Sequence, residues 1–391
     1  MIGSAALIIA AALGPVPPRP LPAPEPDWRR VEAFLDSIIA AGSAPGAVLG
    51  VSWQGRRFIY GAGHLGTGLI QRPDGESIYD LASLTKVVGL TTAVMIAVDE
   101  GRLSLDEPVQ RWVPQFRGAG KDSITLRLLL THASGLPAWK PLFRLTSDRP
   151  EALDLADTTP LDALPGTRFV YSDLGAIVAT QAVEAAYGER IDRIVADHVL
   201  APLRLTSTTY LPPPDWLPRI APTENDPWRG RLLRGEVDDE NAARLDGASG
   251  HAGLFSDADD LLTFGEWLLL GVDGPVTSAA TAVALGAPVY EVAPPRSLAA
   301  FVRRQEIPAD SSRALGWDTP SSGSSAGSRL SPQSFGHTGF TGTSLWIDPT
   351  RRLVIVLLSN RVNPSRGDDR WASMRAPMTD LVVDAIEGPG Q

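Results

Sequence analysis

The sequence predicts an α/β protein of the α+β type, in which one antiparallel sheet is built from both ends of the chain and a mainly helical lobe is inserted between them. Three observations predict this class. Segments typical of strands occur at residues 46–63 and again at 342–360, and residues 84–269 have mostly helical spacing, interrupted by proline-rich loops. Strands at both ends with helices between them favour a sheet that the two termini close together. An active site would lie between the two lobes.

The composition is that of a soluble globular protein. The chain has 391 residues, of which 43% are hydrophobic and 20% are charged, and its formal net charge is −10. No basic cluster is dense enough to follow a phosphate backbone, so nucleic acid is excluded as a partner. The absence of cysteine excludes thiolate catalysis and sulfur-ligated zinc. The five histidines lack metal-ligand spacing, so we expect neither a metal nor a cofactor.

The N-terminus predicts a signal peptide and a proline-rich linker over residues 1–26. Its apolar run, Ala5 to Leu13, is too short to span a bilayer, and prolines follow it. This favours an exported protein, periplasmic or secreted. The usual positive charge before the run is missing, so a cytoplasmic protein stays open. No later run predicts a membrane span. The hydrolase domain would cover 27–391, with the sheet lobe at 27–82 and about 300–391 and the helical lobe from 83 to about 300.

Four terminal elements support this arrangement. A helix is predicted to begin after an N-cap at Asp27, and its apolar face comprises Val31, Phe34, Leu35, Ile38 and Ile39. Residues 46–63 predict two strands that turn at Gln54-Gly55. Residues 342–360 predict a hairpin with its turn at Asp348-Pro349. A last helix is predicted over Met378–Ile386. These elements would form the sheet and its covering helices.

Lysine is rare in this chain, in which nearly all basic residues are arginine, and Lys86 is one of the few. Only Lys86, Lys121 and Lys140 are lysines among 35 basic residues. Arginine cannot give up its proton under ordinary conditions, but lysine can. Lys86 follows Ser83 by three residues at the start of a helical segment, so both side chains would lie on one face of the first turn. Helix-start amides can stabilise an oxyanion, and the amine could take the serine proton. The alternative is a helix-capping serine followed by a surface lysine.

Two further motifs supply the other groups that an acyl-transfer site needs. Tyr171-Ser172-Asp173 precedes a predicted helix, and His337-Thr338-Gly339 leads into a predicted strand. The phenol offers a second proton carrier. The glycine-flanked strand edge offers a backbone donor that substrate can approach closely. The alternatives are a helix-capping aromatic residue and a simple turn.

With these motifs in order, the chain resembles the serine hydrolases related to class C β-lactamases and D,D-peptidases, whose pattern is Ser-x-x-Lys, Tyr-x-Asn and Lys/His-Thr-Gly. The resemblance begins near residue 28 and includes "LLLTHASGLP", "GHAGLFSDADDLLTF" and "HTGFTGTSLWIDP". It implies the β-lactamase/transpeptidase-like fold. The segments "SGLPAWKPLF" and "GEVDDENAA" resemble a branch associated with peptidoglycan turnover, which includes muropeptide amidases.

The resemblance also implies a role for each motif residue. Ser83 would be the acylated nucleophile, Lys86 its base or proton shuttle, and Tyr171 the proton donor to the leaving group and the activator of water. The amides of Ser83 and Phe340 would form the oxyanion hole. The strand edge that holds substrate would contain His337, Thr338 and Gly339.

Two positions depart from the family pattern. Asp173 stands where asparagine is usual, and if ionised it would hold Lys86 charged and move the base role toward Tyr171. His337 stands where dedicated β-lactamases carry lysine, and it would bind a substrate carboxylate less reliably. A β-lactamase is therefore not the favoured function.

Three functions remain, with a small molecule or a peptidoglycan fragment as the partner and no prediction of oligomeric state. The favoured one is an amidase or peptidase acting on peptidoglycan fragments through an acyl-enzyme. The alternatives are a carboxylesterase using the same site and a penicillin-binding sensor or binding module without turnover.

Some motifs are expected to be structural. Residues 323–327 match Gly-x-Ser-x-Gly but lack the strand and helix that a nucleophile elbow needs. His132 and His251 are expected to hydrogen-bond loop backbone. Asp257, Asp259 and Asp260 are expected at a helix N-terminus.

Overall fold

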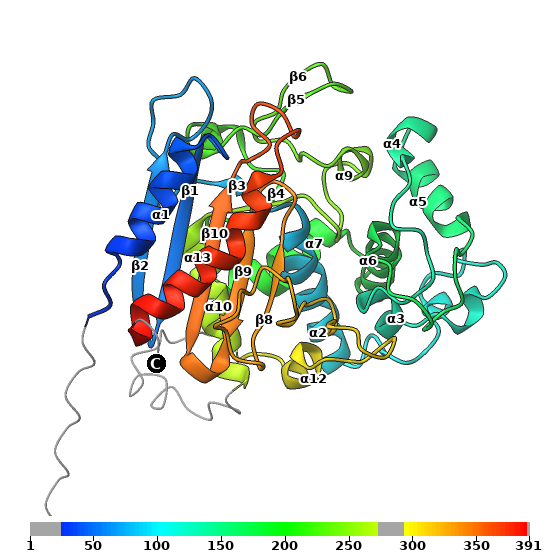
Figure 1. The fold of residues 1–391 in the computed structure, drawn as a ribbon. Helices are drawn as coiled ribbons and strands as arrows, with labels where there is room; N and C mark the ends of the chain where they lie inside the picture. Colours follow the sequence, from blue (N-terminus) through cyan, green and yellow to red (C-terminus); the bar gives the residue numbers. More distant parts are fainter. Residues whose placement is uncertain (1–24, 273–292, 389–391) are drawn as a thin grey trace, which may run out of the picture.

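The computed structural model describes residues 25–272 and 293–388 (Figure 1). The predicted signal peptide and most of the linker lie outside the described residues. The helices are α1 (Arg29–Ala40), α2 (Thr92–Asp99), α3 (Leu126–Leu130), α4 (Leu142–Leu145), α5 (Arg149–Thr158), α6 (Asp173–Tyr187), α7 (Ile191–Val195), α8 (Ala201–Leu203), α9 (Glu240–Arg244), α10 (Ala258–Val272), α12 (Leu298–Val302) and α13 (Arg370–Glu387). The strands are β1 (Gly46–Trp53), β2 (Arg56–Gly63), β3 (Tyr79–Asp80), β4 (Thr209–Tyr210), β5 (Asn225–Asp226), β6 (Arg231–Leu232), β7 (Leu254–Ser256), β8 (Phe335–Thr338), β9 (Ser344–Asp348) and β10 (Leu353–Ser359).

The main sheet joins the two ends of the chain, as the sequence predicts. Its order is β2-β1-β10-β9-β8, and each neighbouring pair is antiparallel. Gln54 and Gly55 both have positive φ, 51° and 80°, which is the tight turn that matches the twist of a hairpin. The second hairpin turns through a single 3₁₀ turn at Pro349–Arg351, where Asp348 accepts the Thr350 N–H at 3.0 Å. The predicted fold class and both hairpins are confirmed. β8 is an edge strand of this sheet.

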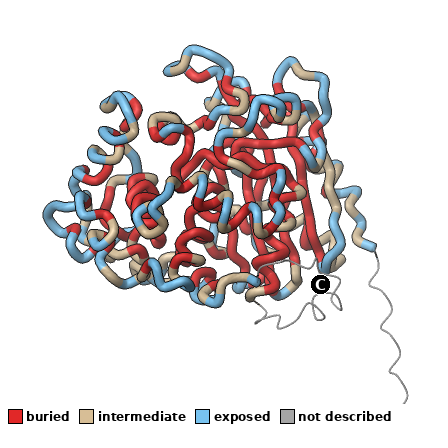
Figure 2. Tube along the Cα trace, turned by 180° about the vertical axis from the view of Figure 1, so that it is seen from behind, coloured by how far each residue is buried: buried red, intermediate tan, exposed pale blue. Residues whose placement is uncertain are grey.

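Helices cover both faces of the sheet (Figure 1). Side chains alternate between the faces along a strand. Leu49 and Val51 of β1 therefore pack in a core with α1 and α13, whereas Val48 packs in the larger core that also contains residues of α2, α6 and α10. Both faces are thus buried, which is why β10 is apolar from Leu353 to Leu358. Figure 2 shows the central strands buried, whereas the edge strand β2 is intermediate or exposed along most of its length.

The helical part places α2 and α6 in its interior. Of the described segments, Ala82–Asp99 is long and apolar enough to cross a bilayer by length and composition, and 78% of it is buried inside the fold. It is not an uncharged run, because it contains Lys86 and Asp99. Its burial matches that of a core helix in a soluble protein.

Three predicted details are wrong. The first helix begins at Arg29, and Trp28 is its N-cap residue. Asp27 does not cap the helix, because its carboxylate accepts the Arg29 amide at 3.2 Å. The last helix begins at Arg370, eight residues early, and runs through Pro377. Trp371 anchors that added first turn by donating its indole N–H to the Gly342 carbonyl at 2.7 Å. The segment after Ser83 is not a single α-helix, as described next.

Candidate active site

Ser83 lies in an irregular turn between β3 and α2. A 3₁₀ turn, Ala82–Leu84, is followed by a π-helical turn, Lys86–Thr91, where the sequence predicted a continuous helix. Ala82 has a φ of 45°, which costs free energy for a residue with a Cβ. Asp80 holds this conformation by accepting the Ala82 amide at 2.8 Å. Both π turns and strained residues of this kind cluster at functional sites.

Lys86 has three partners around one buried nitrogen. Its Nζ donates to Ser83 Oγ at 2.9 Å and to the His251 carbonyl at 2.9 Å, and it lies 2.7 Å from Asp173 Oδ1. The lysine side chain is 3% exposed. Burial alone would lower the lysine pKa, but the Asp173 carboxylate and the neighbouring Tyr171 outweigh it and raise the pKa above the ordinary value. Lys86 is therefore an ammonium at rest, and the ion pair expected for an ionised Asp173 is present.

Tyr171 is held against this ammonium by its surroundings. The Lys86 ammonium lies 5.0 Å from the centre of the phenol ring, and the His132 ring packs at 4.4 Å on it. His132 Nδ1 accepts the Ser172 amide at 3.0 Å, which confirms its expected bond to loop backbone. Ser172, and not Tyr171, caps α6. The buried Tyr171 hydroxyl acts on the nearby Lys86 ammonium and has no other hydrogen-bond partner among the described residues.

The turn between β8 and β9 is fixed beside Ser83. Thr341 and Thr343 donate to the carbonyls of Asp80 and Leu81 at 2.7 and 2.9 Å. A Cβ on Gly339 would lie 2.1 Å from Thr343 Oγ1 and 2.4 Å from the Leu81 carbonyl, so only glycine fits this close approach. His337 and Thr338 end β8 and do not lead into a strand, a correction to the predicted boundary. Pairing with β9 stops at Thr338, because the chain must turn there to reach Ser83.

Two backbone amides in this region are free, that of Ser83 and that of Phe340, which follows the Gly339 packed against Leu81 and Ala82. Within residues 25–272 and 293–388, the N–H groups of Ser83 and Phe340 donate no hydrogen bond to the chain. The Phe340 carbonyl accepts from Arg361 Nε at 2.8 Å, and the Gly339 carbonyl accepts from buried Arg375 at 2.6 Å, which orients the peptide between them. Free amides of this kind can bind an oxyanion.

The positive charge near the edge strand β8 is that of Arg313, a residue that was not singled out from the sequence. The pKa of His337 is well below its usual value because the ring is buried and lies near the charges of Arg313 and Lys86. His337 Nδ1 donates to the Thr338 carbonyl at 2.8 Å. The Arg313 guanidinium stacks 5.5 Å from the Tyr171 ring centre and 5.3 Å from that of Phe169. Its buried Nη1 has no partner among the described residues, and its nearest carboxylate, on Asp318, is 3.8 Å away.

His251 contacts side chains rather than loop backbone, contrary to expectation. Its ring lies between Ser249 Oγ at 2.8 Å and Asp239 Oδ1 at 2.9 Å. Burial would raise the Asp239 pKa, but His251, the Ala242 amide and Lys86 lower it to about 2. A buried imidazole needs hydrogen-bond partners, and the tertiary structure brings Asp239 to this ring from a different segment. This chain of contacts fixes the His251 carbonyl on Lys86.

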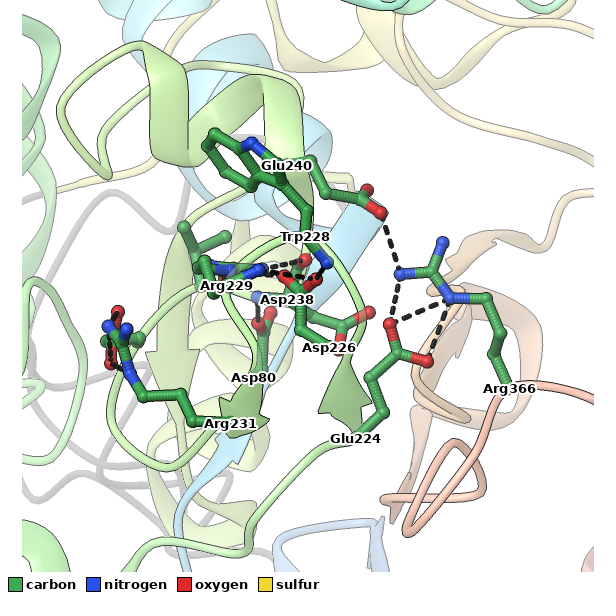
Figure 3. A network of polar contacts seen from close by, with 11 residues as sticks. Asp80, Glu224, Asp226, Trp228, Arg229, Arg231, Asp238, Glu240 and Arg366 are labelled. Atoms are coloured by element: carbon green, nitrogen blue, oxygen red, sulfur yellow. Dashed lines mark hydrogen bonds and ion pairs between the residues drawn. The ribbon is translucent and has the colours of Figure 1, made fainter. Parts of the chain in front are cut away.

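A polar network supports the strand before Ser83 (Figure 3). Asp80 Oδ2 accepts the Asp238 amide at 2.6 Å, while its other oxygen holds Ala82. Arg229 donates to the Val237 and Asp238 carbonyls, each at 2.7 Å. Burial raises the pKa of Asp80 to about 6. Asp80 therefore couples the Ser83 turn to residues 226–239.

The remaining sequence motifs lie apart from this constellation. Asp257 accepts the Asp260 amide at 2.9 Å at the start of α10, as expected for a helix N-terminus. Ser325 accepts the Trp346 indole N–H at 3.1 Å in a turn without flanking strand or helix, so residues 323–327 form no nucleophile elbow. In the part of the chain that the structure describes, no group of three acidic or histidine side chains could hold a metal ion.

Comparison with known proteins identifies relatives of the chain in sequence and in fold. The Beta-lactamase family model matches residues 31–376. The chain is 32% identical over 379 residues to an N-acetylmuramyl-L-alanine amidase of Bacillus subtilis (strain 168), with 85% of this chain and 80% of the relative covered. It is 30% identical over 355 residues to a putative D-alanyl-D-alanine carboxypeptidase of Salmonella schwarzengrund (strain CVM19633), covering 81% of this chain and 78% of that one.

Solved structures share the fold at lower identity. EstCE1, a hydrolase with promiscuous acyltransferase activity, superposes with a TM-score of 0.69 at 23% identity, over 92% of this chain and 98% of that one. A class C β-lactamase from Rhodobacter sphaeroides has a TM-score of 0.67 at 20% identity, covering 90% and 99%.

The fold and these relatives define a serine hydrolase. The chain belongs to the Beta-lactamase family.

Proposed function

We propose that the protein is an amidase that cleaves the bond between a muramyl lactyl group and the first amino acid of a peptidoglycan peptide, through an acyl-enzyme on Ser83. One observation carries the proposal of acyl transfer. Ser83 Oγ, the Lys86 ammonium and Asp173 form one hydrogen-bonded and ion-paired group, and the amides of Ser83 and Phe340 donate no hydrogen bond among the described residues. The amidase of Bacillus subtilis supports the choice of bond.

The proposed chemistry follows from the charge of Lys86. Because the ammonium already donates to Ser83 Oγ, it stabilises the charge that develops there and is not the first proton acceptor. Tyr171 accepts the serine proton as its own proton passes to the leaving nitrogen. Ser83 Oγ bonds to the carbonyl carbon, the C–N bond breaks, and the amides of Ser83 and Phe340 hold the oxyanion. Water, activated by Tyr171, then releases the acyl group.

Arg313 is assigned to the leaving peptide. It stacks on Tyr171, the residue that protonates the leaving nitrogen in this scheme, and its buried Nη1 lacks a partner among the described residues. His337 is neutral near pH 7 because its pKa is depressed, so it cannot supply the cation there. A carboxylate of the peptide would satisfy the free N–H groups.

Removal of the Arg313 charge should weaken binding of the leaving peptide. We expect Arg313→Gln to raise KM about tenfold or more for a substrate whose peptide carries carboxylates, since hydrogen bonds to charged groups contribute about 1.5–3 kcal/mol. The same variant should change KM little for a matched substrate whose peptide carboxylates are amidated. Steady-state kinetics on the two substrates measure this difference. Equal losses on both would assign Arg313 to the support of Tyr171.

The Lys86–Asp173 ion pair predicts a shift in the pH profile. Asp173 raises the Lys86 pKa, so Asp173→Asn should lower that pKa and move the alkaline limb of the pH–rate curve to lower pH. The alkaline limb is the one that moves, because in the proposed reaction the ammonium is the active form and loss of its proton inactivates the site. Because the titrations are coupled, the curve belongs to the group and not to one residue. A curve superimposable on that of the unchanged protein would contradict the ion pair.

Product analysis tests the proposed function. The purified protein would be mixed with a purified muropeptide, with short-chain esters and with a penicillin, and the products and the protein read by mass spectrometry. The proposal expects N-acetylmuramic acid and a peptide with a free amino terminus. Release of D-alanine alone would indicate a carboxypeptidase, ester cleavage alone an esterase, and a lasting penicillin adduct without turnover a sensor.

This function fits an exported protein. We infer that residues 1–26 direct the chain to the cell envelope, where peptidoglycan lies. Fractionation of cells that express the full chain, with detection by an antibody, would find it in the periplasm or the medium. Retention in the cytoplasm would place its substrate there.

A further inference from the structure

Two exposed tryptophans flank the proposed active site. Trp139 is 47% exposed and Trp228 is 38% exposed, which is unusual for such large apolar side chains. Between them lies Phe143, buried to 4% exposure, with its ring centre 6.3 Å from that of Trp139 and 4.9 Å from that of Trp228. We call these three side chains the aromatic platform.

The platform is held rigidly. Asn241 of α9 accepts the Phe143 amide at 3.1 Å and donates to the Lys140 carbonyl at 2.9 Å, on either side of the Pro141-Leu142 step. The guanidinium of Arg244 lies 5.5 Å from the Trp228 ring, and its Nη2 donates to the Phe143 carbonyl at 3.0 Å. A platform fixed in this way loses little conformational entropy when a ligand binds.

The platform adjoins the catalytic group through Asp173, whereas Arg313 contacts the ring of Tyr171. The Ala138 carbonyl, next to Trp139, accepts the Asp173 amide at 2.9 Å, and Asp173 pairs with Lys86. A second connection runs through α9, which begins directly after Asp239, and Asp239 contacts His251. In the proposed reaction the leaving peptide lies at Tyr171 and Arg313. The acyl half of the substrate would then lie toward Asp173 and the platform.

The polar groups beside the platform are those that bind hydroxyl groups. The carboxylate of Glu240 reaches Arg366 (Figure 3), and Glu240 belongs to α9, the helix whose Asn241 and Arg244 hold the platform. The side chains of Asp239, Glu240 and Arg366 are 26%, 16% and 37% exposed, so they are partly open to solvent. A sugar ring presents polarised C–H groups on its faces and hydroxyl groups on its edge. The negative faces of aromatic rings attract the former, and carboxylates accept from the latter.

We propose that the aromatic platform is a subsite for the sugar ring of the acyl half of the substrate, an N-acetylated amino sugar linked through its lactyl ether. The inference rests on the proposed function and names the part of the substrate that this surface binds. A sugar held there would explain how an amidase selects a muramyl amide over a peptide bond.

Two substrates that differ only in the sugar test the subsite. One is N-acetylmuramyl-L-alanyl peptide, and the other is the lactyl-L-alanyl peptide without the sugar. We expect Trp139→Ala and Trp228→Ala each to lower kcat/KM about tenfold for the first, the size of a contact worth about 1.4 kcal/mol, and to leave the second unchanged. Trp139→Phe keeps a ring and should retain most of the activity.

Binding gives a readout without turnover. N-acetylmuramic acid, titrated into the Ser83→Ala protein by calorimetry, should bind about tenfold more weakly when either tryptophan is replaced by alanine. Equal losses on both substrates, or unchanged binding of the sugar acid, would overturn the subsite. Loss of a dimer in the tryptophan variants by light scattering, with sugar binding intact, would instead assign the surface to a second copy of the chain. Failure of the unchanged protein to cleave either substrate would refute the proposed amidase, a different result.

Discussion

Replacement of Ser83 by alanine should abolish hydrolysis of every substrate that the protein cleaves. The hydroxyl oxygen forms the covalent bond in the proposed reaction, so its loss should lower kcat by roughly 10⁴-fold or more. The same variant should no longer be labelled by a serine-directed phosphonate. Ser83 is partly exposed, and its Oγ contacts the chain through Lys86 Nζ at 2.9 Å, so the fold should survive. Activity assays and intact-protein mass spectrometry measure both effects.

Ser325 provides the matched control, because it is the serine of the Gly-x-Ser-x-Gly match at residues 323–327. Its hydroxyl accepts the Trp346 indole N–H in a turn, so Ser325→Ala should keep full activity and full labelling. Continued labelling of the Ser83→Ala protein, with loss of labelling in Ser325→Ala, would move the nucleophile to this turn.

Replacement of Lys86 by arginine should lower kcat by about 10²–10³-fold, the range for loss of one donor that stabilises developing charge at the reacting atoms. From the sequence, Lys86 was expected to act as an amine that gives up its proton. The structure supplies another reason, because three partners surround one nitrogen at 2.7–2.9 Å in a side chain that is 3% exposed. A planar guanidinium cannot direct its donors to all three from one atom, although it keeps the charge.

The folding of this variant must be measured separately. Lys86→Arg keeps a cation near Asp173, whereas Lys86→Met leaves a carboxylate unpaired, and breaking a buried ion pair costs about 3–5 kcal/mol. We therefore expect thermal unfolding at a clearly higher temperature for the arginine variant than for the methionine variant, with both nearly inactive. An arginine variant with near-normal kcat would mean that a positive charge near Ser83 is sufficient and that the geometry of the single lysine nitrogen is not needed.

Periodicity and short motifs predicted the fold class because they depend on local spacing. The apolar runs of β1 and β10 are typical of strands buried on both faces, and the turn at Gln54-Gly55 follows from steric rules that act within a few residues. The spacing of Ser83 and Lys86 likewise placed their side chains together, even though the turn is 3₁₀ and then π in character. Element ends were less predictable, since an N-cap at Asp27 competes with its bond to Arg29.

Contacts between distant segments could not be predicted in the same way. Arg313 reaches Tyr171 across 142 positions, and nothing in its local sequence distinguishes it from the many other arginines of this chain. His251 was expected to contact backbone, but the fold brings Asp239 to its ring. The aromatic platform depends on Phe143 lying between two tryptophans from different segments. Such groups are found only when the tertiary structure is known.

The acyl group carried by Ser83 during turnover tests the central claim most directly. The full chain would be mixed with an N-acetylmuramyl-L-alanyl peptide, quenched with acid at short times, digested and examined by mass spectrometry. Our account predicts a transient ester of N-acetylmuramic acid on the peptide that contains Ser83, which disappears as substrate is consumed. An adduct that carries the amino acids of the substrate, as a carboxypeptidase would form, or an adduct on any other residue, would contradict it.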